Sequence, residues 1–249
     1  MKKLSLDSNA VKLIAIAAMT VDHLAWAMFP GYPREALPVI MHIIGRLTCP
    51  VMCYFVAEGY HCTKNINKYT LRMFLFAVIS HFAYIYASND YVSPLSFIPF
   101  YSGVLNQTGV MWSLAIGLVL LRINDSGLNE VKKSLLTVLC CIAAFPADWS
   151  CIASLWILSF GQNRGKPREQ IIWMMIFALP YALVYFFAID RLYGIIQLTV
   201  IISVPVLRAY NGQRGKSPRL DRFMKWFFYI YYPAHLLAIG LLSTAGVFG

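Results

Sequence analysis

Long apolar runs separated by short polar segments fill nearly the whole chain. A helix needs about 20 mostly apolar residues to cross the hydrocarbon core of a bilayer. The pattern therefore predicts an all-α, polytopic transmembrane helical bundle of about nine spans. The fifth and sixth runs are short, and they are tilted helices, broken helices or one re-entrant pair. The expected number of spans is therefore eight to ten. The nine runs are 9–29, 37–63, 68–88, 104–122, 131–146, 149–162, 170–188, 191–208 and 223–247.

The composition agrees with a membrane protein. Of 249 residues, 59% are hydrophobic and 13% are charged, whereas soluble domains carry roughly 45–50% apolar and about 25% charged residues. The net charge of +10 falls between the apolar runs, so the lipid bilayer is the expected partner and nucleic acid is not. No soluble segment separates the runs, which predicts a single domain over 1–249. Lys2 and Lys3 precede a run that continues to Phe29, so we expect an uncleaved first span.

The distribution of lysine and arginine predicts the topology. Loops on the cytoplasmic side of membrane proteins are enriched in these residues. With a cytoplasmic N-terminus, eighteen of the 21 basic residues fall on the inner side, and only Arg34 and Arg191 fall outside. Arg46 is left within the membrane. The asymmetry predicts an odd number of spans with the N-terminus inside and the C-terminus outside.

Ionisable residues interrupt the first two spans, Asp22 and His23 in the first and His42, Arg46 and Glu58 in the second. Such residues within a membrane indicate a functional site, or a polar contact that joins two helices. His23 lies about six residues from the outer end of its span, and His42 and Arg46 lie at a similar depth. His42 and Arg46 are four residues apart and share a helix face, where Asp22 or a ligand anion could meet them. Asp22 and His23 are adjacent, so they point about 100° apart and need not touch each other.

Two further features concern the inner side. Glu58, with His61 three residues later, is either a polar mouth that faces the cytoplasm or a capping pair at the interface. Pro50 should kink the second span, because it lacks a backbone N–H and clashes with the preceding turn. The loop 209–225 is basic and rich in turn residues. It suits a phosphate-rich ligand such as coenzyme A, or it reflects topology alone.

Several motifs together resemble a known family. They are "KLIAIAAMTVDH" (12–23), "IGRLTCPVMCYFVAEGYHCT" (44–63), "LNQTGVMWSLAIGL" (105–118), "YNGQRG" (210–215) and "FFYIYYPAHLLAIGLL" (227–242). Nearly the whole chain resembles TraX, the family of the inner-membrane protein that acetylates the F-pilin N-terminus. More distantly, it is similar to the larger set of bacterial membrane acyltransferases.

The resemblance implies an acetyl-CoA-dependent transferase. It implies His23 as the catalytic histidine, with Arg46 and Asp22 beside it. Residues expected around the donor are Glu58, Asn106, Tyr232 and His235, joined by Arg214 and Lys216 from the basic loop. The acceptor is a pilin or another envelope component, which the resemblance does not identify. No metal is expected, since none of the six cysteines forms a CxxC pair.

The chemistry leaves two routes open. A neutral histidine suits a general base near neutral pH, and it could instead attack the thioester and carry the acetyl group. Arginine or asparagine could stabilise the oxyanion. The alternatives to a membrane acetyltransferase are a proton-coupled small-molecule transporter, because buried Asp, Glu and His also form proton relays, and a structural or assembly membrane protein.

Overall fold

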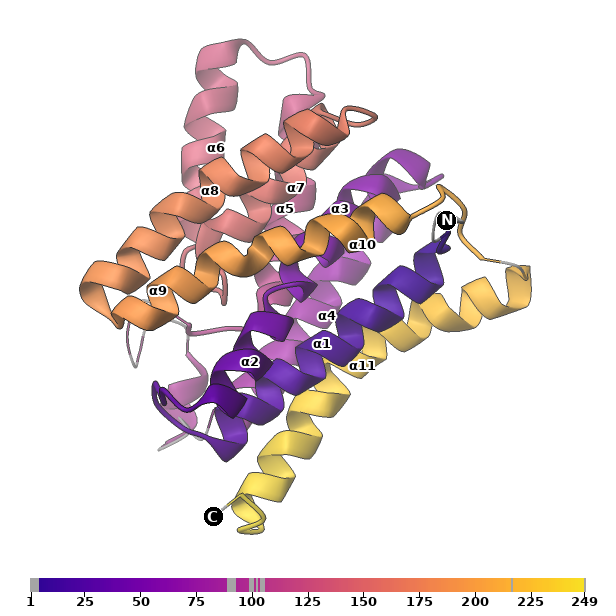
Figure 1. The fold of residues 1–249 in the computed structure, drawn as a ribbon. Helices are drawn as coiled ribbons and strands as arrows, with labels where there is room; N and C mark the ends of the chain where they lie inside the picture. The colour runs from indigo at the N-terminus through magenta and orange to yellow at the C-terminus, as the bar shows by residue number, and fades with distance from the viewer. Residues whose placement is uncertain are drawn as a thin grey trace.

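The computed structural model describes residues 5–88, 93–98, 101, 103, 106–215 and 217–248. These residues form α-helices joined by turns and two 3-10 segments, and no strand occurs among them (Figure 1). The helices are α1 Ser8–Met28, α2 Ala36–Gly45, α3 Thr48–Cys62, α4 Ile66–Ala87, α5 Val110–Asn124, α6 Glu130–Ala144, α7 Ser150–Gln162, α8 Pro167–Ala188, α9 Arg191–Gln197, α10 Ser203–Ala209 and α11 Pro218–Thr244. The 3-10 segments are η1 Pro94–Phe97 and η2 Leu198–Ile202.

Within the described part of the chain, six helical segments are long and apolar enough to cross a membrane. The second consists of α2 and α3, and the fifth of α9, η2 and α10. Two shorter apolar helices, α5 and α7, accompany them. The all-α membrane architecture is therefore confirmed, whereas the count of about nine spans and their orientation stay predictions. The six segments are Ser8–Met28, Ala36–Cys62, Ile66–Ala87, Pro167–Ala188, Arg191–Ala209 and Pro218–Thr244.

Local sequence signals explain where several helices begin. The side chain of Asp7 accepts a hydrogen bond from the backbone N–H of Ala10 at the start of α1, and Asn65 and Asn129 cap α4 and α6 in the same way. Such caps satisfy N–H groups that lack a partner within the helix. Pro167 and Pro218 occupy the first turns of α8 and α11, where a missing N–H costs nothing.

Contacts between helix ends define two ends of the bundle. At one end, the backbone N–H of Ser8 donates to Gln213, and Arg164 pairs with Glu58. At the opposite end, Arg34 pairs with Asp190. Apart from Arg34, Arg46 and Arg191, the described lysines and arginines lie in or near the segments that meet at the first end, which we call the basic end. The basic residues in question are Lys12, Lys64, Lys68, Arg72, Arg122, Lys132, Lys133, Arg164, Lys166, Arg168, Arg208, Arg214, Arg219, Arg222 and Lys225.

Helices α5, α6 and α7 run from the basic end only to the middle of the bundle. Irregular backbone at such a depth requires internal hydrogen-bond partners. The indole of Trp112 donates to the carbonyl of Ala143 in the last turn of α6 (2.8 Å). The backbone N–H of Val110 donates to the hydroxyl of Tyr232 (3.2 Å), and that of Asp148 donates to the carbonyl of Thr108 (2.8 Å). The two short runs, 131–146 and 149–162, were expected to be tilted, broken or one re-entrant pair. In the structure they form a hairpin, α6 and α7, whose turn lies inside the bundle.

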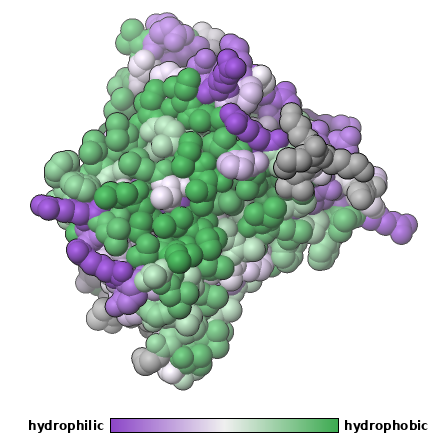
Figure 2. All heavy atoms as spheres, in the orientation of Figure 1, coloured by the Kyte–Doolittle hydropathy of each residue, from purple (hydrophilic) through white to green (hydrophobic). Residues whose placement is uncertain are grey.

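The outer surface is mostly apolar. Figure 2 shows hydrophobic residues over most of the visible face, with hydrophilic residues gathered near its edges. Large apolar side chains on α4, α6 and α8 are exposed, among them Leu71, Val131 and Phe187. An apolar patch of this extent on a soluble protein would mark an interface. On a bundle of membrane-spanning helices it is the surface that lipid contacts.

Candidate functional site

The second span is broken next to the predicted site. Helix α2 ends at Gly45 and α3 begins at Thr48, so the break lies at Arg46 and Leu47. Pro50 explains it, because a proline ring clashes with the carbonyl four residues earlier, here that of Arg46. The predicted kink is therefore confirmed. A Cβ on Gly45 would overlap the side chain of Asp22, so this glycine makes the room in which the Asp22 carboxylate lies.

Asp22 and Arg46 form the centre of a buried polar network. One terminal nitrogen of Arg46 donates to both carboxylate oxygens of Asp22 (2.9 Å each), and the other donates to the side chain of Gln197 (2.9 Å). The Nδ1 atom of His42 donates to Asp22 (2.8 Å), and the Arg46 Nε group donates to the His42 carbonyl (3.3 Å). His42 and Arg46 thus meet Asp22 from one face, as their spacing predicts.

The turn between α6 and α7 covers the Arg46 guanidinium. Its Cζ atom lies 5.0 Å from the centre of the Trp149 ring, a distance at which a cation is attracted to the face of an indole. Trp149 has a φ of 62° and Ser150 a φ of 48°, a left-handed conformation that is unfavourable for bulky residues. The surrounding hydrogen bonds of the hairpin hold it in place. Asp148 lies within electrostatic range of Arg46 and Asp22.

His23 faces away from this network, toward α11. Its Nδ1 atom lies 2.7 Å from Nε2 of His235, and the two rings are nearly parallel (4°) and meet edge to edge, with centroids 4.9 Å apart. His235 is buried, and its Nδ1 atom lies 2.9 Å from the carbonyl oxygen of Tyr231. The Tyr231 hydroxyl contacts that of Thr20 (2.7 Å), one turn from His23 on α1. Among the described residues, nothing is hydrogen-bonded to Nε2 of His23. We call His23 and His235 the histidine pair.

An aromatic cluster covers the network on the side away from the basic end. The Trp26 ring lies 4.5 Å from that of His42, and Tyr193 lies 5.3 Å from His42 and 4.9 Å from Tyr32. The Tyr193 hydroxyl donates to the carbonyl of Pro33 (3.2 Å). His42 is fully buried beneath these rings, and its Nε2 atom has no hydrogen-bond partner among the described residues.

The other predicted residues lie elsewhere. Glu58 accepts two hydrogen bonds from Arg164 (3.0 and 3.1 Å), a contact that joins α3 to the turn after α7. Arg214 donates to the carbonyl of Cys62 at the basic end (3.5 Å). The exposed Asn106 has a φ of 55° before α5, and no contact among the described residues joins it to the histidine pair. Lys216 lies outside the described residues.

Tyr232 is the second α11 residue that reaches the site. Its ring is buried, with its centroid 6.4 Å from that of His23. A Cβ on Gly109 would overlap its hydroxyl. The tyrosine therefore links the histidine pair to the start of α5, and Gly109 provides the space it needs. Among the described residues, no group of three or more His, Cys, Asp or Glu side chains is placed to hold a metal ion.

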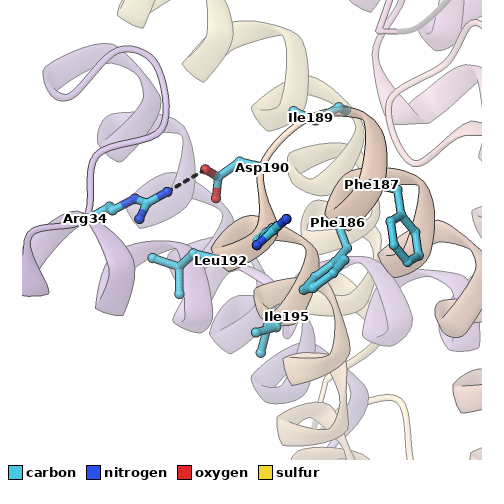
Figure 3. Close-up of a pocket in the computed structure, with 8 residues that line it drawn as sticks. Arg34, Phe186, Phe187, Ile189, Asp190, Leu192 and Ile195 are labelled. Atoms are coloured by element: carbon cyan, nitrogen blue, oxygen red, sulfur yellow. Dashed lines mark hydrogen bonds and ion pairs between the residues drawn. The ribbon is translucent and has the colours of Figure 1, made fainter.

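Two surface grooves lie at the ends of the bundle, and the histidine pair lines neither. The larger, of about 640 Å³, lies at the opposite end from the basic end, between the end of α8 and α9 (Figure 3). There Arg34 points toward Asp190 across the groove (3.3 Å). The pKa of Asp190 is lowered, first by the hydrogen bond from the backbone N–H of Tyr193 and also by Arg34. The other groove, at the basic end, includes Arg219 and Arg222.

The fold and the site together define a class, a helical membrane protein with a buried ion network and a histidine pair at mid-depth. Residues 7–243 match the family described as "TraX protein", and the chain belongs to this family.

The chain is also similar to two curated proteins, the first of which agrees with this assignment. The chain is 29% identical over 262 residues to the "Probable fimbrial assembly protein FimC, serogroup H1" of Dichelobacter nodosus, a match that covers 99% of this chain and 98% of the relative. It is also 31% identical over 71 residues to the "Uncharacterized protein RP591" of Rickettsia prowazekii (strain Madrid E), covering 28% and 24% of the two chains. No solved structure matches the chain.

Sequence reasoning missed three parts of the site. Gln197, the second partner of Arg46, is fully buried. Its polar amide interrupts the apolar run 191–208, and this could have marked it as a candidate partner of a buried charge. Trp149 gives no such signal, because aromatic residues are common throughout the chain. The third part is the contact between α1 and α11 that brings His23 to His235, which neither run indicates alone.

Proposed function

We propose that this protein is a membrane-embedded acetyltransferase that moves an acetyl group from cytoplasmic acetyl-CoA to an acceptor at the outer side of the membrane. The acceptor class we propose is a pilin or another component of the cell envelope. The observation that carries the proposal is His23. It lies at mid-depth in the bundle, its Nδ1 atom contacts a second histidine, and its Nε2 atom has no partner among the described residues.

Membership in the TraX family and the match to a fimbrial assembly protein support a role near pilus components. A transporter based on proton relays fits less well. Asp22, the carboxylate nearest to the histidines in sequence, is already paired with Arg46 and His42. Its oxygens are thus already held by a cation and a hydrogen-bond donor, whereas a relay needs a carboxylate that can exchange protons with its neighbours.

The reaction balances by either of two routes. In the first, His23 accepts a proton from the acceptor nitrogen or oxygen as that atom attacks the thioester carbonyl, the C–S bond breaks, and the proton passes to the thiolate. In the second, His23 itself attacks the carbonyl, the C–S bond breaks, and the acceptor then takes the acetyl group from the imidazole while losing its proton. Both give an acetylated acceptor and free coenzyme A.

The donor would enter from the basic end, which we propose faces the cytoplasm. Lysine and arginine are enriched on that side of membranes, and phosphate groups of coenzyme A would meet Arg214 and the residues around it. Cys62 at this end is exposed, whereas the other cysteines are buried or half-buried. A membrane-impermeant maleimide should thus label Cys62 only from the cytoplasmic side, while Glu35→Cys, at the opposite end, should be labelled from outside. The reverse pattern would overturn the orientation.

The decisive test of activity is mass spectrometry of intact envelope proteins and glycans from cells with and without the protein. Acyl transfer predicts an acceptor that gains about 42 Da only when the protein is present. His23→Ala should remove this increment. His81→Ala is the matched control, because His81 is another histidine within a spanning helix, and its hydrogen bond among the described residues goes to the carbonyl of Phe97 (2.6 Å), away from the histidine pair.

Loss of the increment in both variants would point to a folding defect. Its persistence in His23→Ala would exclude His23 as the reacting group. Donor binding can be followed separately, because a ligand at a hundred times its Kd stabilises the native state by about 2.7 kcal/mol. Acetyl-CoA should therefore raise the unfolding midpoint of the purified wild-type protein.

A further inference from the structure

The carbonyl of Tyr231 and the two rings of the histidine pair form a hydrogen-bonded chain, and the hydrogen atoms along this chain can be assigned. It runs from the carbonyl of Tyr231 through both ring nitrogens of His235 to Nδ1 of His23. A carbonyl oxygen can only accept a hydrogen bond. The Nδ1 atom of His235, at 2.9 Å from that oxygen, must therefore carry the hydrogen.

The remaining nitrogen of His235 follows from the charge of the ring. Burial of a charged group is unfavourable unless it is paired. His235 is only 7% exposed, and its hydrogen-bond partners among the described residues are a carbonyl and a second imidazole. The ring is therefore neutral, and its Nε2 atom is an acceptor.

The assignment then passes to His23. Because Nε2 of His235 accepts, the hydrogen in the 2.7 Å contact belongs to Nδ1 of His23. A neutral imidazole carries one hydrogen, so Nε2 of His23 keeps its lone pair. The ring nitrogen on the far side of His23 is thus the one that can accept a proton or attack a carbonyl.

We propose that His235 is a positioning residue that fixes the tautomer and ring orientation of His23, so that Nε2 is the reacting atom. This inference rests on the proposed function for its kinetic consequence, but the tautomer itself does not depend on it. The partner in this role is a second histidine bound to a backbone carbonyl in place of a carboxylate. The reactive histidine therefore gains no nearby negative charge from its orienting group.

The first experiment reads the tautomer directly. The chain has five histidines, so nitrogen NMR of protein labelled with ¹⁵N-histidine gives few signals, and His23→Gln identifies those of His23. We expect the Nδ1-protonated form in the wild type and a shift toward the Nε2-protonated form in His235→Phe. Thr20→Val is the matched control, because it removes the hydroxyl contact with Tyr231 between the same two helices but leaves both histidines and the Tyr231 carbonyl unchanged.

The second experiment measures turnover of acetyl-CoA in the same variants. Because general-base catalysis contributes roughly 10²–10⁴-fold, His235→Phe should lower kcat by about tenfold to a hundredfold and leave KM for acetyl-CoA unchanged. His235→Gln should stay within about tenfold of the wild type, since its amide oxygen can accept the same hydrogen bond. Thr20→Val should be close to the wild type.

The outcomes separate the two claims. An Nε2-protonated His23 in the wild type, or an unchanged tautomer in His235→Phe, would overturn the role of His235 whatever the activity. Equal losses in His235→Phe and Thr20→Val would reduce His235 to a packing contact between helices. Absence of transfer in the wild type would count against the proposed function, while the NMR result would still decide the tautomer.

Discussion

Two neighbouring residues of α1 lie in opposite environments. Asp22 faces the break in the second span, where Arg46 and His42 satisfy its oxygens. His23, the next residue, faces α11, where one ring nitrogen has a partner and the other has none among the described residues. A helix places adjacent side chains about 100° apart, so Asp22 and His23 point into different surroundings from the same turn of α1.

The difference between these two surroundings separates a structural contact at Asp22 from an incompletely bonded side chain at His23. The Arg46 guanidinium has partners in Asp22, Gln197 and the carbonyl of His42, and Trp149 covers it. A group with so many contacts must lose some of them before it can bind a substrate. The side of Asp22 therefore fixes helix positions, whereas on the side of His23 one ring nitrogen has no partner among the described residues and is, in our proposal, the reacting atom.

The largest expected effect is that of His23→Ala on turnover. Removal of the reacting nitrogen should lower acetyl transfer by at least about a hundredfold, while affinity for acetyl-CoA changes little because a base acts mainly in the transition state. The measurement pairs turnover with donor affinity in the purified variant. Normal turnover would return His23 to the role of a polar contact between α1 and α11.

Asp22→Asn should act mainly on stability. The variant keeps the shape of the side chain but leaves the Arg46 charge buried without its counter-ion, which costs about 3–5 kcal/mol. Thermal unfolding in detergent should show a large drop in the midpoint, together with a smaller loss of turnover per folded molecule. Glu130→Gln is the control, because its pair with Lys133 is exposed and should contribute at most about 1 kcal/mol. Equal effects of the two changes would contradict the comparison.

Gly45→Ala tests the same network without changing a charge. The added Cβ would overlap the side chain of Asp22, and overpacking of this kind costs about 1–3 kcal/mol. The unfolding midpoint should fall by less than in Asp22→Asn. Gly127→Ala serves as the comparison, since a Cβ there meets nothing within 4 Å. A stable Gly45→Ala protein would mean that Asp22 has an alternative position.

The smallest effect is expected at Arg34. Its side chain is 75% exposed, so Arg34→Gln should change stability by at most about 1 kcal/mol at neutral pH. Because the folded-state pKa of Asp190 is lowered, this pair contributes above the ordinary aspartate pKa of about 3.9 and is lost as the pH falls below it. The difference between wild type and Arg34→Gln should disappear in acid, as unfolding midpoints across pH would show.

The polar residues of α1 and of the second span could be predicted because charge is unfavourable in lipid. Asp22, His23, His42 and Arg46 interrupt apolar runs, and helical spacing places two of them on one face. Pro50 marks the break for a similarly local reason. These predictions depend on the chemistry of single residues and on distances of a few positions along the chain.

Contacts between distant segments could not be predicted in the same way. Glu58 was expected near a ligand or His61, yet its partner is Arg164, 106 positions later. The left-handed backbone of Trp149 depends on the turn that holds it, since tryptophan has no preference for that conformation. The pairing of His23 with His235 likewise requires α1 and α11 to lie side by side, which neither segment encodes alone.

The length of α6 has a consequence for the surrounding bilayer. This helix has 15 residues and buries only Ala144 of them, so at 1.5 Å per residue its exposed face is at most about 22 Å long, and the first turn of that face is charged. The hydrocarbon core of a typical bilayer is about 30 Å thick. Lipid beside α6 must therefore thin locally or tilt around the hairpin, at a cost that grows with the mismatch. One flank of the molecule is thus adapted to shorter acyl chains than the others, and its stability should depend on the thickness of the membrane in which it is placed.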